Sequence, residues 1–270
     1  MPDAPRELLV TVDADVDAER VAQAGLTARV APLPAGGDVQ EFLYVLSHDM
    51  GGPIRRVVSF GELLRQRLDG QLDERTASCL GYMIQGGQTL RNMLDALLQL
   101  SQVETQGRPF QSTQLTDVFT SAARRLEPAL AHASAQLVVD GLPAVQGDRV
   151  QLEELAHALL DNAIKFREPG RPLSIHVGGE RFAADGGERV RVRIQDNGLG
   201  FDSARIGRFF RIFGTGHTAG AHPGVGAGLA VAQRIVRRHG GTLTGTGEPG
   251  VGATFELVLP GAGGARPSAP

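Results

Sequence analysis

A histidine and an aspartate stand side by side in a segment whose apolar residues recur at helical spacing. His48 and Asp49 begin the run HDMGGP, which ends at Pro53. A lone histidine on a helix is more often structural than catalytic, but an adjacent carboxylate can hold one imidazole nitrogen as N–H and leave the other as a nucleophile. Pro53 removes a helix hydrogen bond, so we expect it to bend the helix just past His48 and let a partner domain reach the imidazole.

An asparagine interrupts a second, leucine-rich helical segment that is predicted to begin near Arg149. Asn162 lies in the run LLDNAIKF, at residues 159–166. Taken alone, such an asparagine is most often a hydrogen-bonded polar group of the core. Its carbonyl oxygen is also a hard ligand of the kind that Mg²⁺ prefers. Lys165 lies one turn further on the same side and could neutralise phosphate charge.

Asp196, Gly198 and Gly200 follow a β-rich run at 189–196, in the order D-x-G-x-G. By itself this pattern is a weak signal and is typical of a turn. Its functional interpretation is a carboxylate at a strand end that accepts a hydrogen bond from an adenine amino group. The glycines would then let the backbone approach the base closely.

A glycine-rich run, GVGAGL at residues 224–229, opens a helix that is expected to end at His239. Two arginines in the last turn and glycines directly after it are typical of a helix end. A loop before a helix offers backbone N–H groups to phosphates. The pattern is weak alone, and it is not the dinucleotide fingerprint because no strand of a βαβ unit precedes it.

Between these two glycine motifs, residues 214–223 are rich in glycine and histidine and are predicted to form a mobile lid. His217 and His222 raise the question of a metal site in this lid. Neither a cysteine nor a carboxylate cluster accompanies them in the sequence. We therefore expect no metal there.

Two long amphipathic segments, 39–68 and 73–104, flank a turn at Asp69 and Gly70 and predict an antiparallel helical hairpin. A lone hairpin cannot bury both apolar faces, so we predict that two copies form a four-helix bundle in a homodimer. The alternative is a hairpin that packs only on its own C-terminal domain. Cys79, the single cysteine, is expected to be a small buried hydrophobe.

Residues 110–260 mix the helical and strand periods and predict an α/β sandwich, in which helices cover one face of a mixed sheet. The predicted helices are 116–133, 149–167 and 228–239, and the predicted strands are 136–139, 173–178, 189–196, 242–246 and 254–259. We expect a phosphoacceptor-bearing hairpin domain over 38–107, a second domain over 108–262 and a disordered tail over 263–270. Residues 1–37, with a strand–helix–strand pattern, have no assigned role.

The composition excludes several classes of protein. A net charge of −3 gives no reason to expect nucleic-acid binding. One cysteine allows no intrachain disulfide, which fits a reducing cytoplasm. No apolar run approaches the roughly 20 residues that a membrane helix needs, and the N-terminus does not have the pattern of a signal peptide. We expect a cytoplasmic protein with no membrane segment in this chain.

The order of these motifs resembles that of the sensor histidine kinases of two-component systems, over about residues 40–260. The run SHDMGGPIR is similar to their H box, LLDNAIKF to the N box, DNGLGFD to the G1 box and GVGAGLAVAQRIVRRHGG to the G2 box. FFRIF, at 209–213, resembles the F box, and GVGATFELVLP, at 250–260, resembles the last glycine turn and closing strand. The match is closest to the soluble phytochrome-like branch. It implies that the second domain has the GHKL-type ATP-binding fold shared with gyrase, Hsp90 and MutL.

The resemblance also implies roles for the matching residues, with ATP and Mg²⁺ as cofactors. His48 would take the γ-phosphoryl group and pass it to an aspartate of a response regulator, and Asp49 would orient or deprotonate it. Asn162 would hold Mg²⁺, Lys165 would contact phosphate and Asp196 would bind adenine. The nucleotide loops would be formed by Gly198, Gly200, Gly224, Gly226, Gly228 and Leu229.

Three departures from the family pattern keep other functions open. Ala158 stands where the N box usually has a second asparagine, which favours a non-catalytic scaffold or histidine phosphotransfer protein with a degenerate ATP domain. Gly52 stands where phosphatase-active members often carry Thr or Asn, so we expect weak phosphatase activity. Residues 1–40 contain no recognisable sensor domain. A related ATPase or serine kinase of the same fold is a third alternative, which the His-Asp hairpin disfavours.

Overall fold

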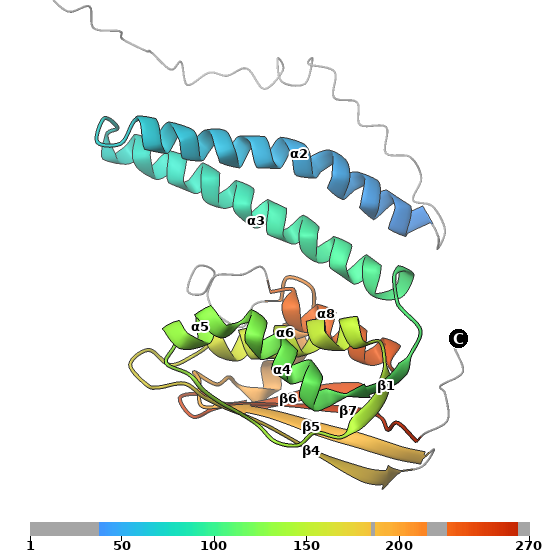
Figure 1. Ribbon diagram of the computed structural model, residues 1–270. Coiled ribbons are helices and arrows are strands. Elements are labelled where there is room, and N and C mark those ends of the chain that lie inside the picture. Colours follow the sequence, from blue (N-terminus) through green and yellow to red (C-terminus); the bar gives the residue numbers. More distant parts are fainter. Residues whose placement is uncertain (1–37, 185–186, 215–225, 264–270) are drawn as a thin grey trace, which may run out of the picture. The chain divides into compact units, whose positions relative to one another are not determined.

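The computed structural model describes residues 38–184, 187–214 and 226–263, with side chains from Asp49 onward (Figure 1). The predictions for residues 1–37, for most of the lid, for Gly224 and for nearly all of the C-terminal tail therefore lie outside the described residues. Among the helices that are described, none is long and apolar enough to cross a membrane.

The predicted hairpin is present as α2 (Asp38–Arg67) and α3 (Glu74–Thr105). Asp73 caps α3, because its carboxylate accepts hydrogen bonds from the backbone N–H and the hydroxyl of Thr76 at 2.9 and 2.7 Å. The chain continues as one helix through Pro53. The two helices and the turn between them thus follow the boundaries that the sequence predicts to within a residue or two.

Two glycines allow α2 and α3 to pack closely. A Cβ atom on Gly61 would lie 2.7 Å from Cγ1 of Ile84, and one on Gly87 would lie 2.7 Å from Cγ2 of Val58. Ile84 and Val58 are themselves buried in the hairpin. A larger residue at either glycine would require the facing side chain, Ile84 or Val58, or its helix to shift.

The hairpin covers only part of its apolar surface. Phe60 and Tyr82 remain 62% and 74% exposed. Cys79 is also exposed, so the prediction that it is buried was wrong for the single chain. Cys79 precedes the buried Ile84 by five residues, which turns it about 140° away on α3 and off the face that α2 covers.

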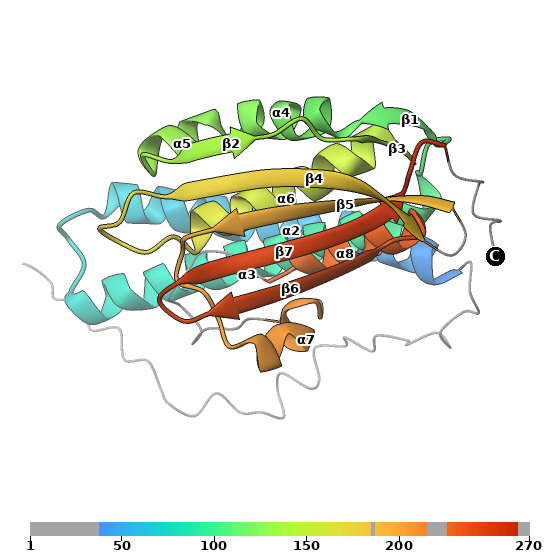
Figure 2. The ribbon, with the colours of Figure 1, turned by 90° about the horizontal axis from the view of Figure 1, so that it is seen from below.

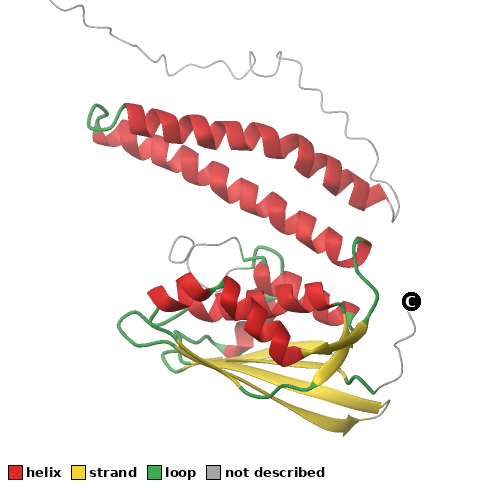
Figure 3. Ribbon diagram, in the orientation of Figure 1, coloured by secondary structure: helices red, strands yellow, loops and turns green. Residues whose placement is uncertain are grey.

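The second domain has two layers, with helices on one face of a five-stranded sheet (Figures 2 and 3). The sheet order is β2-β4-β5-β7-β6, in which β2 and β4 are parallel and every other pair is antiparallel. This mixed sheet confirms the predicted α/β sandwich. The helices are α4 (Leu115–Arg125), α5 (Glu127–His132), α6 (Arg149–Lys165), η1 (Ser203–Arg205), α7 (Ile206–Phe209) and α8 (Gly228–Arg238). The strands are β1 (Gln111–Gln114), β2 (Gln136–Val139), β3 (Ala144–Gly147), β4 (Ser174–Ala184), β5 (Gly187–Asp196), β6 (Thr242–Glu248) and β7 (Gly252–Pro260).

The core of this domain lies between the sheet and the helices. Along β5, the buried Val190, Val192 and Ile194 alternate with side chains on the other face, as the period of a strand requires. Leucines of α6 pack on the same core, among them Leu159 and Leu160, which are fully buried. Each such side chain contributes about 1.5–3 kcal/mol through burial.

The structure differs from the sequence-based prediction in several places. Strand β4 extends six residues beyond the predicted 173–178, and the short helices η1 and α7 were not predicted. The predicted helix over 116–133 is divided at Leu126 into α4 and α5. Pro128, in the first turn of α5, lacks an N–H, and in a continuous helix its ring would clash with the carbonyl four residues earlier, on Arg124, which explains the break. The pair of strands β1 and β3 was not predicted, because their sequences, QSTQ and AVQG, lack the run of β-branched and apolar residues that marks a strand such as QLVV in β2.

Helix α8 ends as its sequence predicts. Gly240 has a positive φ of 68°, its N–H donates to the carbonyl of Arg237, and the N–H of Gly241 donates to that of Val236, each at 2.9 Å. This is the Schellman arrangement that satisfies the last carbonyls of a helix. It fixes the position of His239, which directly precedes the glycines.

His239 is a buried neutral imidazole that joins α8 to the start of α6. Its Nε2 accepts the backbone N–H of Asp148 at 3.0 Å, and its Nδ1 donates to the carbonyl of Ile235 at 2.7 Å. Burial lowers the pKa of His239 below its ordinary value of 6.5, and the charge of Arg238 lowers it further, against the opposing effects of Ile235 and Asp148. Above pH 6.5 the neutral imidazole makes its full contribution to the free energy of unfolding. That contribution is lost as the pH falls below this value, because the unfolded chain then binds the proton first.

We therefore predict that wild-type protein exceeds a His239→Gln variant in free energy of unfolding by a margin that narrows as the pH falls from about 8 to about 5. Denaturant unfolding followed by circular dichroism at several pH values measures this margin. His132→Gln, at an exposed position in α5, is the control and should keep the wild-type pH dependence. A margin that stays constant or widens in acid contradicts a buried neutral imidazole at position 239.

Candidate functional site

The candidate phosphoacceptor lies on α2. The backbone of His48 and Asp49 is helical, and Asp49 is exposed. Gly51 and Gly52 follow in the same helix, where an added Cβ would meet nothing nearer than the guanidinium tips of Arg55 and Arg56, at 4.0 and 3.9 Å. Packing among the described residues therefore does not require these glycines.

One face of α6 connects the other candidate residues. Ala158, Asn162 and Phe166 follow one another at four-residue intervals, which puts them on the same side of the helix. The methyl group of Ala158 lies 3.9 Å from where a Cβ of Gly228 would be, at the start of α8. The carbonyl of Phe166 accepts the N–H of Leu199 at 2.8 Å. Asn162 thus lies between the start of α8 and the loop after β5.

Among the described residues, no side chain caps the start of α8. Ala227 is its N-cap and provides no side-chain hydrogen bond to the first turn. Gly226 has a φ of 70°, which favours glycine, and Leu229 packs against the core. Gly224 lies outside the described residues. As far as the described residues go, the first turn of α8, which meets Ala158, therefore keeps N–H groups that no side chain caps.

Asp196 stands at the end of β5 and is only 9% exposed. Its Oδ1 accepts the backbone N–H of Gly198 at 2.8 Å. Burial raises the pKa of Asp196 above its ordinary 3.8, and this effect exceeds the opposing hydrogen bonds from Gly198 and Ala253 and the charge of Arg171. The carboxylate is thus held in an environment that favours a further hydrogen-bond donor.

Packing within the protein requires glycine at positions 198 and 200, which the sequence alone did not indicate. A Cβ on Gly198 would collide with the carbonyl oxygen of Phe166. Gly200 has a φ of 65°, and a Cβ there would collide with the carbonyl oxygen of Glu248 in the β6–β7 turn. Both glycines are needed for the loop to pack against the protein's own backbone, whatever else the loop contacts.

Arg171, which the sequence did not indicate, holds this loop by hydrogen bonds to its backbone carbonyls. Its Nη2 donates to the carbonyls of Asn197 and Gly198, the latter at 2.9 Å, and its Nη1 donates to that of Gly250 at 3.3 Å. The side chain of Asn197 completes the support by bonding the backbone N–H of Ser174 at 2.8 Å. Arg171 is followed by a proline in an irregular segment, so no periodic pattern marks it.

Lys165 has a partner within its own helix. Its Nζ lies 2.5 Å from the carboxylate of Asp161, one turn earlier. Asp161 therefore belongs to the candidate site, although the sequence analysis did not name it. A contact between Lys165 and a phosphate would have to compete with this ion pair.

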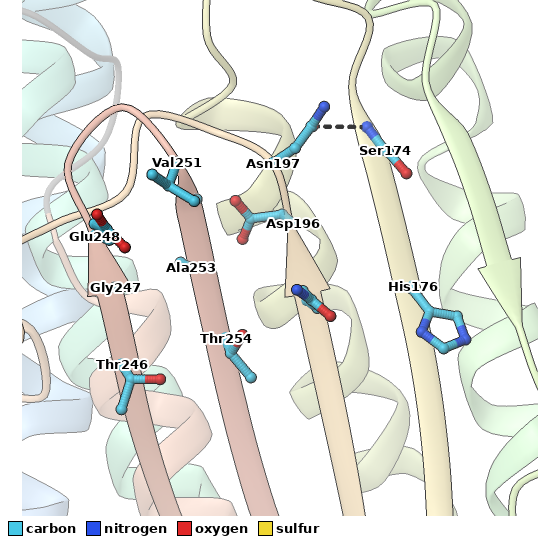
Figure 4. Close-up of a pocket in the computed structure, with 12 residues that line it drawn as sticks. Ser174, His176, Asp196, Asn197, Thr246, Gly247, Glu248, Val251, Ala253 and Thr254 are labelled. Atoms are coloured by element: carbon cyan, nitrogen blue, oxygen red, sulfur yellow. Dashed lines mark hydrogen bonds between the residues drawn. The ribbon is translucent and has the colours of Figure 1, made fainter.

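The hollow in Figure 4 lies at the same end of the sheet but on its other face. Its volume is about 500 Å³. His176, Gln195 and Thr254 line it, and Asp196 at the end of β5 also contributes to the lining. The first three alternate with the buried Ile175, Ile194 and Phe255, so they point away from the helices. By the same alternation, the side chain of Asp196 points to the face of the sheet that the helices cover. Asn162 and α8 lie on that face too. We assign the candidate site to that side.

Asn162 suits a hard cation bound together with phosphate. Its carboxamide makes no hydrogen bond to any of the described residues, and it is half-buried. Within the described part of the chain there is no cluster of three His, Cys, Asp or Glu residues that could hold a metal alone. This agrees with Mg²⁺, which usually keeps few protein ligands and shares phosphate oxygens with them.

Two family models match the chain, in sequence order. The His Kinase A (phospho-acceptor) domain matches residues 38–106, and the histidine kinase-, DNA gyrase B-, and HSP90-like ATPase family matches residues 147–263. Together these segments cover more than half of the chain. The first contains His48, and the second contains Asn162, Asp196 and the start of α8.

The relatives share the same region. Cyanobacterial phytochrome A of Nostoc sp. is 33% identical over 226 residues, which cover 84% of this chain and 29% of that protein. The phytochrome-like protein Cph1 of Synechocystis sp. is 30% identical over 226 residues, covering 84% of this chain and 30% of that protein. The chain therefore spans less than a third of the length of these relatives. Full-length ShkA, solved in complex with AMPPNP, shares the fold with a TM-score of 0.58 and 24% identity, covering 84% of this chain and 47% of that chain.

We predict that Asp196→Asn stabilises the free protein and weakens nucleotide binding. Its amide oxygen can keep the bond to Gly198, and the energetic cost of a buried carboxylate disappears; because the folded pKa is raised, that cost is present at neutral pH. The amide nitrogen would face an adenine amino group donor to donor, so affinity should fall about tenfold to 100-fold. Thermal unfolding and titration with a fluorescent ATP analogue measure the two effects.

Asp202→Asn is the matched control, because this exposed residue keeps its cap on Ala204 as an asparagine and should change neither quantity. If Asp196→Asn binds nucleotide as the wild type does, or lowers the melting temperature, this description of Asp196 is wrong.

Proposed function

Because the chain belongs to the sensor histidine kinases, with a phosphoacceptor domain followed by a GHKL-type ATPase domain, we propose that it is an ATP-dependent protein-histidine autokinase. We take residues 38–107 as the dimerisation and phosphoacceptor domain and 108–262 as the ATP-binding domain. His48 is the proposed acceptor of the γ-phosphoryl group.

The observation that carries this proposal is the position of Asn162 on α6. One turn before it, Ala158 faces the uncapped start of α8, and one turn after it, Phe166 holds the loop of Gly198 by a backbone hydrogen bond. If the adenine of a nucleotide binds at Asp196 and its phosphates bind at the start of α8, Asn162 lies between the two ends of the nucleotide. Full-length ShkA, which shares the fold, was solved in complex with AMPPNP, and the proposal of a nucleotide-binding function agrees with that.

The proposed reaction needs few protein groups. One imidazole nitrogen of His48 attacks the γ-phosphorus; a nitrogen–phosphorus bond forms, the bond to the bridging oxygen breaks, and ADP leaves with the electron pair. Asp49 takes or holds the proton of the other imidazole nitrogen. Asn162 would hold Mg²⁺, which supplies charge neutralisation at the phosphates. Positioning and charge neutralisation account for most of the catalysis of phosphoryl transfer.

The phosphoryl group would then pass from His48 to an aspartate carboxylate of a response regulator, forming an acyl phosphate and restoring the neutral imidazole. The match of residues 38–106 to a phosphoacceptor domain supports this second step.

We also propose that the chain acts as a homodimer through its hairpin. Met50, Val57, Phe60 and Leu64 recur along α2 at intervals of seven, three and four residues, and all are exposed. Such a stripe is typical of a helix that packs on a partner helix. Pairing two hairpins around a two-fold axis would bury it.

The alternative function is a scaffold or histidine phosphotransfer protein with a degenerate ATP domain. Ala158 favours it, because its methyl group occupies the place beside Gly228 where the family usually has an amide. Two features favour the kinase. The carboxamide of Asn162 makes no hydrogen bond to the described residues, and Arg171 holds the loop that follows Asp196.

We predict that purified protein incubated with Mg²⁺ and γ-labelled ATP acquires label that is stable in base and labile in acid. His48→Ala should remove the label entirely. Asn162→Ala should lower the rate by about 100-fold or more, because it removes the proposed protein ligand of the Mg²⁺ that would neutralise charge in the transition state. Gel autoradiography over time measures both effects.

Label that persists in His48→Ala would disprove His48 as the acceptor. No label on a folded wild-type dimer, together with weak nucleotide binding, would support the scaffold alternative.

We predict that Phe60→Glu dissociates the dimer. Two unpaired carboxylates would be buried in the two-fold interface, which should raise the dissociation constant by about 100-fold or more. Sedimentation velocity over a range of protein concentrations measures it. Ser59→Glu, the adjacent exposed position off the apolar stripe, is the control and should remain dimeric. A Phe60→Glu protein that stays dimeric places the interface elsewhere.

A further inference from the structure

The segment between α3 and β1 is held against the end of α8 and the start of α6. The ring of Phe110 stacks on the imidazole of His239, with centroids 4.5 Å apart and 12° between the ring planes. The guanidinium of Arg238 lies 4.9 Å from the centroid of the same Phe110 ring. The backbone of Arg108 is bonded on both sides: its N–H donates to the Asp148 carboxylate at 2.6 Å and its carbonyl accepts from Nη2 of Arg238 at 3.2 Å.

Arg238 is the centre of this cluster. Its Nη1 donates to Oε1 of Gln151 at 2.8 Å and lies 3.6 Å from the carboxylate of Asp148, whose side chain is 1% exposed. That carboxylate also caps α6 by accepting the N–H of Val150 at 3.1 Å. The planar fork of an arginine can bond several partners and stack on an aromatic ring at once, which a lysine cannot.

Gly107 makes room for Arg238. A Cβ on Gly107 would overlap the guanidinium of Arg238. The three atoms nearest to such a Cβ all belong to that guanidinium. Gly107 has no positive φ that would require glycine. The absence of a side chain at position 107 therefore serves the approach of Arg238 to the segment.

The last turn of α3 is bonded to the same two helices. The carbonyl of Val103, a buried residue, accepts from Nε2 of Gln151 at 2.7 Å. Arg234 of α8 lies 2.6 Å from the carboxylate of Glu104. Gln151 therefore bonds the end of α3 with its amide nitrogen and Arg238 with its amide oxygen.

Helix α8 joins this cluster to the candidate nucleotide site. It begins at Gly228, beside Ala158, and ends at Arg238. Its eleven residues span about 16 Å, and Ala232, Ile235 and Val236 are fixed in the core. A helix packed in this way moves as one body, so a displacement at its glycine end reaches the segment after α3.

We propose that Arg238 is a positioning residue for phosphoryl transfer: it locks the segment 106–110, through which the phosphoacceptor hairpin is attached, to the helix whose first turn meets the nucleotide. This inference rests on the proposed kinase function. Arg238 touches neither ATP nor His48 in this assignment. It sets the attachment of the hairpin to the nucleotide domain, so its loss should affect the rate of transfer rather than the binding of nucleotide.

The test compares Arg238→Gln with Arg237→Gln in the full chain. Arg237 is adjacent, exposed and in the same last turn of α8. We expect Arg238→Gln to lower the autophosphorylation rate at saturating ATP by about tenfold or more, since displacements of about 1 Å can cost 100-fold. The KM for ATP and the affinity for a fluorescent ATP analogue should change less than about twofold. Arg237→Gln should match the wild type.

Gly107→Ala is the second variant, because its methyl group displaces the flexible end of Arg238 without removing any charge. It should reproduce the loss of rate with unchanged nucleotide affinity. Wild-type rates in both Arg238→Gln and Gly107→Ala overturn the inference, and so does a parallel loss of nucleotide affinity, which would indicate a merely structural role. An unlabelled wild-type protein overturns the proposed function and this inference together.

Discussion

The site depends on one backbone hydrogen bond between the helical layer and the sheet. The carbonyl at the end of α6, on Phe166, accepts the N–H of Leu199 in the loop after β5. The bond is possible only because Gly198 has no side chain to meet that carbonyl. It sets the distance between Asn162, one turn back on α6, and Asp196, at the end of β5. The ends of two elements far apart in the sequence are thereby held as one surface.

The same surface contains a conflict between stability and function. Burial of Asp196 raises its pKa and disfavours the charged form that would bind an adenine amino group. The protein offsets this with backbone donors and with the charge of Arg171, which also bonds the loop carbonyls. Asn162 shows the complementary case, a half-buried amide that no described residue uses. Groups kept in unfavourable or unsatisfied states are expected where a ligand completes them.

Much of the fold was predictable from the sequence, because long periodic segments dominate it. Helices α2, α3, α6 and α8 and the strand β5 lie close to their predicted bounds, and the phytochrome-like resemblance agrees with the relatives found. The roles of His48, Asn162 and Asp196 remain predictions. Arg171 and Arg238 could not be found in the sequence, because their partners lie between 26 and 130 residues away. Cys79 was misjudged because the type of a residue does not tell which side of α3 faces α2.

The most direct measurement is a crystal structure of the protein with a non-hydrolysable ATP analogue and Mg²⁺. We predict that the adenine amino group binds at the carboxylate of Asp196 and that Mg²⁺ binds at the carboxamide oxygen of Asn162. The phosphates should bind at the first turn of α8. A nucleotide bound instead in the hollow lined by His176, Gln195 and Thr254, on the uncovered face of the sheet, would contradict it.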